Sequence, residues 1–191
     1  VHFLYIMQLL YDFIRLGIKL MPNLFLNKVL EKDSKNENAL CGIAMIESNA
    51  DSEYFKHITD VFKMNPNNPN ILLTMSETYF YKDELERAEN LAKRGLQIVE
   101  TTTQKEQTIK DIKLLHSNFL LLLGKILHVK EDYNKAFKYY DDAVNTCDNN
   151  PVAIHYLGTM NLHLRNYSEA EKNFEKVLEL TKVDKENLSE R

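Results

Sequence analysis

The segment "LGKILHVKEDYNKAFKYYDDAV", residues 123–144, decides the fold because its pattern returns as "LGTMNLHLRNYSEAEKNFEKVL", residues 157–178. The offset between the two copies is 34 residues, as 158 minus 124 shows for the glycines. A period of this length is typical of stacked helix–turn–helix units, in which each unit buries its apolar face against the next. The matching positions are Gly124 and Gly158, Tyr133 and Tyr167, Ala136 and Ala170, and Tyr140 and Phe174.

The same period extends toward the N-terminus, with one interruption. In residues 73–96, Ser76 takes the glycine position and Ala88 takes the alanine position. Gly124 minus Ser76 is 48, which is the 34-residue period plus an insertion of 14 residues, placed at 103–116. Apolar residues recur there at helical spacing, so we expect the insertion to lengthen the next first helix. The threonines 101–103 are the expected break before it.

These offsets divide the chain into repeated units. Gly42 lies 34 residues before Ser76, and Ala44 with a short deletion is an alternative register. The chain starts at Val1 rather than at a methionine, so we expect a fragment of a longer array. The predicted segments are a shortened unit at 1–34, full units at 35–68, 69–102, 117–150 and 151–184, the insertion at 103–116, and a polar tail at 185–191.

Local signals predict where several helices begin. Asn68-Pro69 and Asn150-Pro151 each place a capping residue before a proline at the first helical position. Asn166 followed by Glu169 has the spacing of a capping box, and Asp83 with Glu86 repeats it. Only five glycines are present and no alternating β-branched run occurs, so the sequence favours an all-α fold.

Composition narrows the classes of function. The chain has 24 basic and 28 acidic residues, a net charge of −4, so no basic surplus favours direct nucleic-acid binding. Asp12 and Arg15 interrupt the apolar opening before the roughly 20 residues that a membrane span needs. Cys41 and Cys147 have neither metal-site nor redox spacing, so buried thiols are expected.

The pattern resembles the tetratricopeptide repeat (TPR) family. That family places Leu-Gly on the first helix of each unit, as at Gly124 and Gly158, and Ala followed by an aromatic residue on the second, as at Ala136 with Tyr140. The resemblance covers residues 35–184, and more weakly the first 34. It implies an all-α solenoid, a right-handed superhelix of stacked helix–turn–helix repeats.

The resemblance also implies a binding surface, because TPR superhelices hold extended peptides or partner helices along their first helices. We expect this concave groove to contain residues from three units. They are Asn70, Leu73, Glu77, Phe80 and Tyr81, then Asn118, Leu121, Lys125, His128 and Val129, then Val152, His155, Thr159, Leu162 and His163. The alternative for Leu121, Val129 and Leu162 is simple packing against adjacent helices.

One ligand class of this family is excluded by the residues present. Chaperone adaptors of the family hold a C-terminal carboxylate with Lys, Asn and Arg side chains. The matching positions here carry Leu73, Glu77, Leu122, Val152 and Tyr156, which offer apolar groups and a negative charge. A mixed aromatic and aliphatic groove fits an apolar segment of a partner better.

No catalytic constellation is visible in the sequence. Gly124-Lys125 lacks the upstream glycine and the following Ser or Thr of a phosphate-binding loop, and no HExxH, GxSxG or CxxC motif occurs. His128 and His163 are predicted on neighbouring helices, but no further ligands accompany them for a metal site. The sequence therefore predicts a protein that is not an enzyme and that needs no cofactor and no metal.

A closer resemblance is to the large TPR scaffold subunits of RNA polymerase II-associated factor complexes. "NPNNPNIL", "YFYKDELERAENLA", "HVKEDYNKAFKYY" and "FEKVL" occur in the same order as in that family. The stretch FLLLLGKIL departs from the polar first helix expected there. The resemblance implies a nuclear scaffold that holds other subunits of the complex and meets the polymerase indirectly. The alternatives are the substrate-docking arm of a glycosyltransferase or ubiquitin ligase, and a free cytosolic adaptor.

Overall fold

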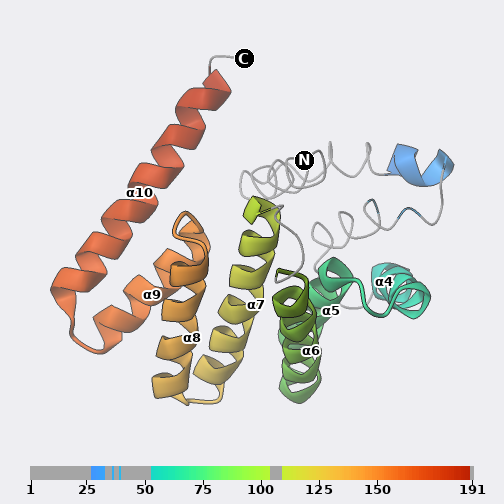
Figure 1. Cartoon of the computed structure of the whole chain (residues 1–191), viewed down its shortest axis with the longest axis horizontal. Coiled ribbons are helices and arrows are strands. Elements are labelled where there is room, and N and C mark those ends of the chain that lie inside the picture. The colour runs from blue at the N-terminus through green and yellow to red at the C-terminus, as the bar shows by residue number, and fades with distance from the viewer. Residues whose placement is uncertain (1–26, 33–35, 37–38, 40–52, 104–108, 190–191) are drawn as a thin grey trace. The chain divides into compact units, whose positions relative to one another are not determined.

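The described part of the chain is helical, which confirms the all-α prediction. The computed structural model describes residues 27–32, 36, 39, 53–103 and 109–189, and the regular secondary structure in these ranges consists of helices (Figure 1). Residues 27–32 are helical. The following helices are α4 (Glu53–Met64), α5 (Pro69–Tyr81), α6 (Leu85–Thr103), α7 (Ile109–Val129), α8 (Tyr133–Thr146), α9 (Pro151–His163) and α10 (Tyr167–Ser189).

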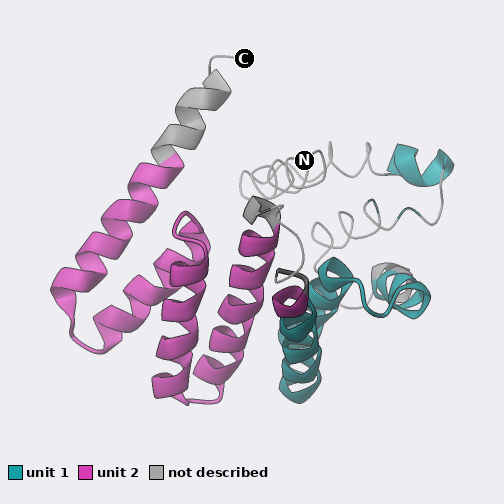
Figure 2. Ribbon diagram, viewed as in Figure 1, with its two compact units in different colours: residues 1–98 teal, residues 99–191 magenta. Residues whose placement is uncertain are grey.

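The chain forms two compact units, residues 1–98 and residues 99–191, and the boundary lies inside α6 (Figure 2). In the first unit, α4 packs against α5. Ile58 and Val61 of α4 meet Ile71 and Met75 of α5, and all four are at most 2% exposed. Burying an aliphatic side chain of this size stabilises the fold by about 1.5–3 kcal/mol, so this cluster holds the two helices together.

The second unit is a sequential stack of antiparallel helix pairs. α7 packs against α8, α8 against α9, and α9 against α10. The repeated alanines of the second helices, Ala136 and Ala170, are small residues in the interior, 0% and 2% exposed. The largest fully buried side chains of this unit are Phe119, Leu122, Leu123, Ile126, Tyr140, Ile154 and Met160.

The two repeat glycines lie directly under aromatic rings of the second helix of their own unit. A Cβ atom at Gly124 would lie 2.5 Å from Tyr140 Cε1, and one at Gly158 would lie 3.0 Å from Phe174 Cε1. Large aromatic residues at these repeat positions are predicted to fill the space toward the next unit. Both rings also cover the glycine of their own unit, which explains why no side chain stands at Gly124.

The proline-associated caps form as predicted. Asn68 precedes Pro69 and its side-chain oxygen accepts from the Asn70 backbone N–H at 3.0 Å. Asn150 precedes Pro151 and its oxygen accepts from the backbone N–H groups of Val152 and Ala153, at 3.2 and 3.3 Å.

Both predicted capping boxes are wrong. The Asn166 backbone N–H, which Glu169 would have bonded, donates instead to the Asn161 carbonyl at 2.8 Å. The Glu169 carboxylate accepts from Lys172 Nζ at 2.6 Å. Asp83 is not a cap, because its φ is +62° and α6 begins two residues later.

The left-handed conformation of Asp83 recurs at Glu131 and Arg165, each with φ +62°. Arg165 follows Glu131 by the 34-residue period (165 minus 131), and Glu131 follows Asp83 by 48 (131 minus 83). Each of the three residues lies in the tight turn between the two helices of a pair. L-residues with a side chain adopt this region at a cost of roughly 1–2 kcal/mol, so the turn is a strained feature of the repeat.

The two helices on either side of the insertion are both long. α6 has 19 residues and α7 has 21, whereas α8 has 14 and α9 has 13. The expected break at residues 101–103 is wrong, because α6 continues through Thr103. The question of Gly42 against Ala44 and the position of Cys41 lie outside the described residues.

One helix in the described part of the chain is long and apolar enough to pass a test for a membrane span. It is the part of α7 from Ile112 to Val129, with a mean hydropathy of 1.3. Core helices of soluble proteins pass the same test. Phe119, Leu122 and Ile126 of this segment are at most 2% exposed, because they pack inside the second unit.

Candidate protein-interaction site

In the first unit, the predicted groove residues lie along α5. Asn70 and Tyr81 are exposed, and Leu73, Glu77 and Phe80 are partly buried. The Phe80 and Tyr81 rings meet edge to face, with centroids 5.5 Å apart. This end of α5 therefore presents aromatic surface, and Tyr81 is 66% exposed.

In the second unit, the predicted residues lie on α7 and α9 and differ in exposure. Leu121 is only 6% exposed, so it packs inside the helices, which is the alternative considered for it. Val129 and Leu162 are 52% and 49% exposed. His155 and His163 are also exposed, whereas Asn118, Lys125, His128, Val152 and Thr159 are partly buried.

His128 is the centre of an aromatic cluster. Its ring centroid lies 6.1 Å from that of His163, so the two histidines are on neighbouring first helices as predicted. The Tyr133 ring lies 5.5 Å away, and the Tyr140 hydroxyl lies 3.4 Å from His128 Nδ1. Burial raises the pKa of Tyr140 above the ordinary tyrosine value, so its hydroxyl stays protonated even in alkaline solution.

The cluster continues along the unit. The Tyr140 and Tyr156 centroids are 5.5 Å apart, and Lys125 Nζ lies 5.1 Å from the Tyr156 ring centroid. His155 then contacts both Tyr156, at 5.9 Å, and Phe174, at 5.7 Å. We call this continuous set the ring row: His163, His128, Tyr140, Tyr156, His155 and Phe174.

Sequence reasoning missed Tyr156 and Phe174, which are partly buried, as members of the ring row. Tyr140 is 0% exposed, so it is the buried link of the row, in keeping with its place on a second helix. Tyr156 was considered only as a mismatch to a carboxylate clamp. The repeat did contain a signal for Tyr140 and Phe174. Aromatic residues at matching positions of adjacent units lie near one another when the units stack.

A buried polar bridge fixes α9 to α7 at the start of both predicted groove segments. Asn150 is 2% exposed, and its amide donates to Ser117 Oγ at 2.9 Å and to Asn118 Oδ1 at 3.0 Å. Ser117 Oγ donates in turn to the Ala143 carbonyl of α8 at 2.8 Å. Three helices are therefore joined through one capping residue, and Asn118 serves this bridge.

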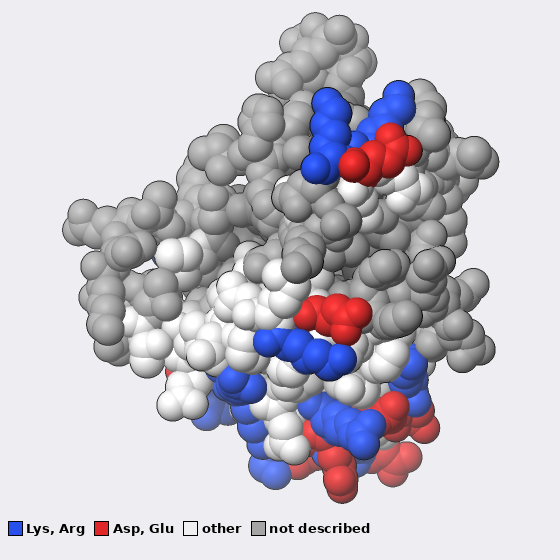
Figure 3. Space-filling model, turned by 90° about the vertical axis from the view of Figure 1, so that its right-hand side faces the viewer, with Lys and Arg blue, Asp and Glu red and all other residues white. Residues whose placement is uncertain are grey.

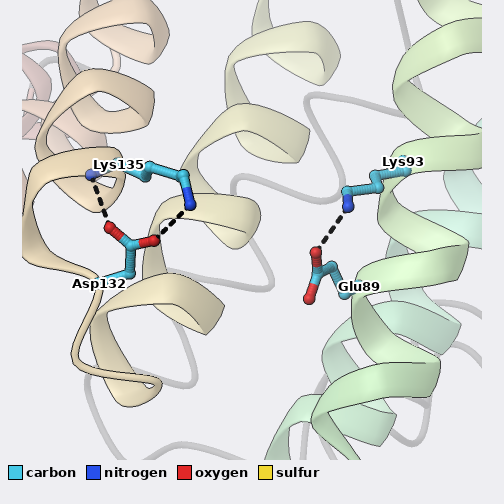
Figure 4. A network of polar contacts seen from close by, with 4 residues as sticks. All are labelled: Glu89, Lys93, Asp132 and Lys135. Atoms are coloured by element: carbon cyan, nitrogen blue, oxygen red, sulfur yellow. Dashed lines mark hydrogen bonds and ion pairs between the residues drawn. The ribbon is translucent and has the colours of Figure 1, made fainter.

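Charged side chains on the surface are paired locally. Asp132 caps α8 and accepts from both the backbone N–H and the ammonium of Lys135, and on α6 Glu89 pairs with Lys93 at 2.6 Å (Figure 4). On the face seen in Figure 3, Lys and Arg side chains lie beside Asp and Glu side chains of the described residues. On this face the two signs of charge are therefore interspersed.

Within the described residues, no group of three or more His, Cys, Asp or Glu side chains could hold a metal ion. Cys147 is 8% exposed, as expected for a buried thiol, and burial raises its pKa. The geometry offers contact surface, in the form of aromatic faces, imidazole edges and exposed aliphatic groups.

Comparison with known proteins connects this geometry to a family. Residues 152–183 match the tetratricopeptide repeat family. The chain has the TPR fold. The match covers α9 and most of α10, which is the unit that contributes His155, His163 and Phe174 to the ring row.

Solved structures agree on this fold over nearly the whole chain. A crystal structure of the APC/C hetero-tetramer Cut9–Hcn1 covers 91% of this chain and 31% of its own, with a TM-score of 0.67 and 14% identity. The structure of PilF from Pseudomonas aeruginosa matches 92% of this chain and 74% of its own length, with a TM-score of 0.63 and 15% identity. The thermophilic TPR protein TTC0263 of Thermus thermophilus matches 93% of this chain and 91% of its own length, with a TM-score of 0.63 and 16% identity.

A curated relative is more informative about role. The chain is 25% identical over 171 residues to the RNA polymerase-associated protein CTR9 of Caenorhabditis elegans. The alignment covers 86% of this chain and 14% of that protein, so the chain spans about a seventh of the relative's length. The TPR fold and this relative support a role in protein–protein interaction, as a scaffold.

Proposed function

We propose that the chain is part of a nuclear scaffold of the RNA polymerase II-associated factor complex. Its repeats hold other subunits of that complex, and so support transcription elongation and co-transcriptional histone modification. Contact with the polymerase is indirect, and no direct contact with nucleic acid or membrane is part of the role. The chain performs no catalysis of its own.

The observation that carries this proposal is the similarity to an RNA polymerase-associated protein over 86% of the chain. It coincides with the resemblance found in the residues themselves, where "HVKEDYNKAFKYY" is the most specific block. Both lines of support come from the amino-acid sequence, one as an alignment over 171 residues and the other as the order of local motifs.

The ring row supplies a surface suited to this role. Aromatic side chains dominate the energetics of protein interfaces, because they bury large areas at low entropic cost. Val129 and Leu162 add exposed aliphatic groups beside His128 and His163. An apolar segment of a partner subunit that lies along α7 and α9 would cover these groups and remove them from water.

Affinity purification of the full-length protein from nuclei, with identification of the co-purifying chains, tests the proposal. We expect polymerase-associated factor subunits to co-purify. A glycosyltransferase or ubiquitin-ligase activity in the same chain, or a purely cytosolic set of partners, would overturn it in favour of a docking arm or a free adaptor.

Single substitutions connect that result to the surface. Leu162→Glu and Val129→Glu each place a carboxylate where the partner's apolar segment is proposed to lie, and a loss of at least about tenfold in affinity is expected for a residue at an interface centre. Asn134→Glu is the matched control, because it adds the same carboxylate at an exposed position of α8. Equal binding by all three variants would place the interface elsewhere on the chain.

A further inference from the structure

Apart from Asp111 in the first turn of α7, the first helices of the second unit contain no acidic residue. From Ile112 to Val129, α7 contains Lys113, Lys125 and two histidines but no Asp or Glu, and α9 contains two histidines and no Asp or Glu. The chain as a whole has 28 acidic residues against 24 basic ones, so this exclusion is not a consequence of composition. The second helices differ, since α8 and α10 both contain Asp or Glu as well as Lys.

Four basic groups of these first helices lie on the ring row, whereas His116 of α7 faces Glu100 of α6 at 3.7 Å. Lys125 Nζ stands over Tyr156, His128 lies against His163, and His155 lies between Tyr156 and Phe174. Tyr140 contacts His128 at Nδ1, which leaves Nε2 of that ring for another partner. Ammonium and imidazole groups therefore accompany the aromatic surface along its length.

From this arrangement we infer that the ring row binds a short segment of a partner protein in which acidic residues stand beside apolar ones. The inference rests on the proposed scaffold function and adds the chemistry of the partner. Carboxylates of the segment meet Lys125, His128 and His155 in charge-assisted hydrogen bonds, which are roughly twice as strong as neutral ones. Apolar side chains of the segment meet Val129 and Leu162, which are 52% and 49% exposed.

The charge complementarity selects this occupant over other anions. A nucleic acid requires several phosphate contacts from Lys or Arg, but the same stretch of α7 and all of α9 contain no arginine and only two lysines. The exposed aliphatic groups would also stay uncovered by a phosphate backbone. An acidic and apolar protein segment can contact both the basic groups and the aliphatic surface.

Selection from a random-peptide phage library on the purified full-length protein tests the inference. We expect the selected peptides to be enriched in Asp and Glu next to Leu, Ile or Phe. Lys125→Glu should weaken binding of the best peptide about tenfold, the effect of one charge-assisted contact, and should strengthen binding of the same peptide with lysine in place of its acidic residues. A misfolded variant cannot produce that gain.

Lys138→Glu is the matched control, because it makes the same charge reversal at an exposed position of α8 and should leave both affinities unchanged. Selected peptides without an acidic excess, or equal effects of Lys125→Glu and Lys138→Glu, would overturn the inference. Binding of an oligouridylate that Lys125→Glu abolishes would also overturn it, in favour of RNA.

The result is separable from the proposed function. Acidic peptides selected by a protein that does not co-purify with polymerase-associated subunits would leave the inference standing and refute the function. Co-purification with those subunits, together with no preference for acidic peptides, would support the function and refute the inference.

Discussion

The Tyr140 ring occupies the space that a side chain at Gly124 would need, with Cε1 2.5 Å from the position of the missing Cβ. The same ring contacts His128 and Tyr156 in the ring row. One buried side chain therefore closes α8 onto α7 and also supports the exposed members of the ring row from beneath. The geometry of the site therefore depends on the packing of Tyr140 against Gly124.

Gly124→Ala should lower the stability of the fold. Alanine favours a helix over glycine by about 1 kcal/mol, but its Cβ would overlap the fully buried Tyr140 ring. Overpacking of this kind costs about 1–3 kcal/mol, so a net loss is expected in the free energy of unfolding measured by urea denaturation. A stability equal to or above that of the wild type would show that the ring moves aside freely.

Gly158→Ala provides a graded comparison at the equivalent position. Its Cβ would lie 3.0 Å from Phe174 Cε1 and 3.2 Å from Asn173 Cβ, so the ring and α10 must both give slightly. These contacts are longer than the 2.5 Å at Gly124, so the loss should be smaller at Gly158. A double variant gives a second check. Adding Gly124→Ala to Tyr140→Leu should cost less than Gly124→Ala alone, because the atoms that clash have been removed.

Much of the fold was predictable because the repeat fixes it several times over. Gly124, Ala136 and Tyr140 all recur at one offset, so each position supports the others. The helix starts at Pro69 and Pro151 were also predictable, since the Asn-Pro pair acts through local chemistry alone. The repeat tolerates exceptions, as at Ser76, which takes the glycine position with 0% exposure because its hydroxyl donates to the Leu72 carbonyl at 2.7 Å.

The failures of prediction have equally specific causes. Asp83 is a good capping residue by type, but the backbone path of the turn places it in the left-handed region. Asn166 lost its capping box because the Asn161 carbonyl bonds its N–H first. The ring row was only partly predicted, since which aromatic rings meet depends on how first and second helices of adjacent units pack.

Replacing the left-handed residues by glycine should stabilise the fold. Glu131 and Arg165 both have φ +62°, a region that glycine adopts freely. Relief of roughly 1–2 kcal/mol of strain, offset by the greater freedom of glycine in the unfolded chain, predicts a gain of about 0.5–1 kcal/mol for Glu131→Gly. Thermal unfolding of the single variants checks this.

Lys130→Gly is the control for that prediction, because Lys130 precedes Glu131 in the same turn and is not among the residues with positive φ. Glycine there relieves no backbone strain and adds unfolded-state freedom, so stability should fall. A gain at Lys130 equal to that at Glu131 would mean that the effect does not come from backbone strain.

Asn150→Ala should be more damaging than loss of an ordinary cap. The change removes two bonds to α9 backbone N–H groups and two donations toward Ser117 and Asn118. Cap loss costs about 1 kcal/mol, and each buried polar group left unsatisfied adds about 1–3 kcal/mol. Asn68→Ala, at a more exposed cap, is the comparison. Similar losses of unfolding free energy in the two variants would argue against the buried bridge.

Asp132 gives the fold a specific pH dependence. Hydrogen bonds from the Lys135 side chain and backbone lower the pKa of its carboxyl group. A carboxyl whose pKa is depressed by folding stabilises the protein above its unfolded pKa, about 3.9, and this contribution disappears as the pH falls through the folded value. Asp132→Asn keeps a capping oxygen but not the charge, so it should be less stable than wild type near neutral pH. The difference in unfolding free energy should close at acidic pH, as measured by urea denaturation across a pH series.

The control for this prediction is a Lys135→Met background. There the difference at neutral pH should shrink, because the ammonium partner is gone and only the backbone bond to Asp132 remains. A difference that persists unchanged in that background, or that grows as the pH falls, would mean that the Asp132–Lys135 contact does not contribute to stability.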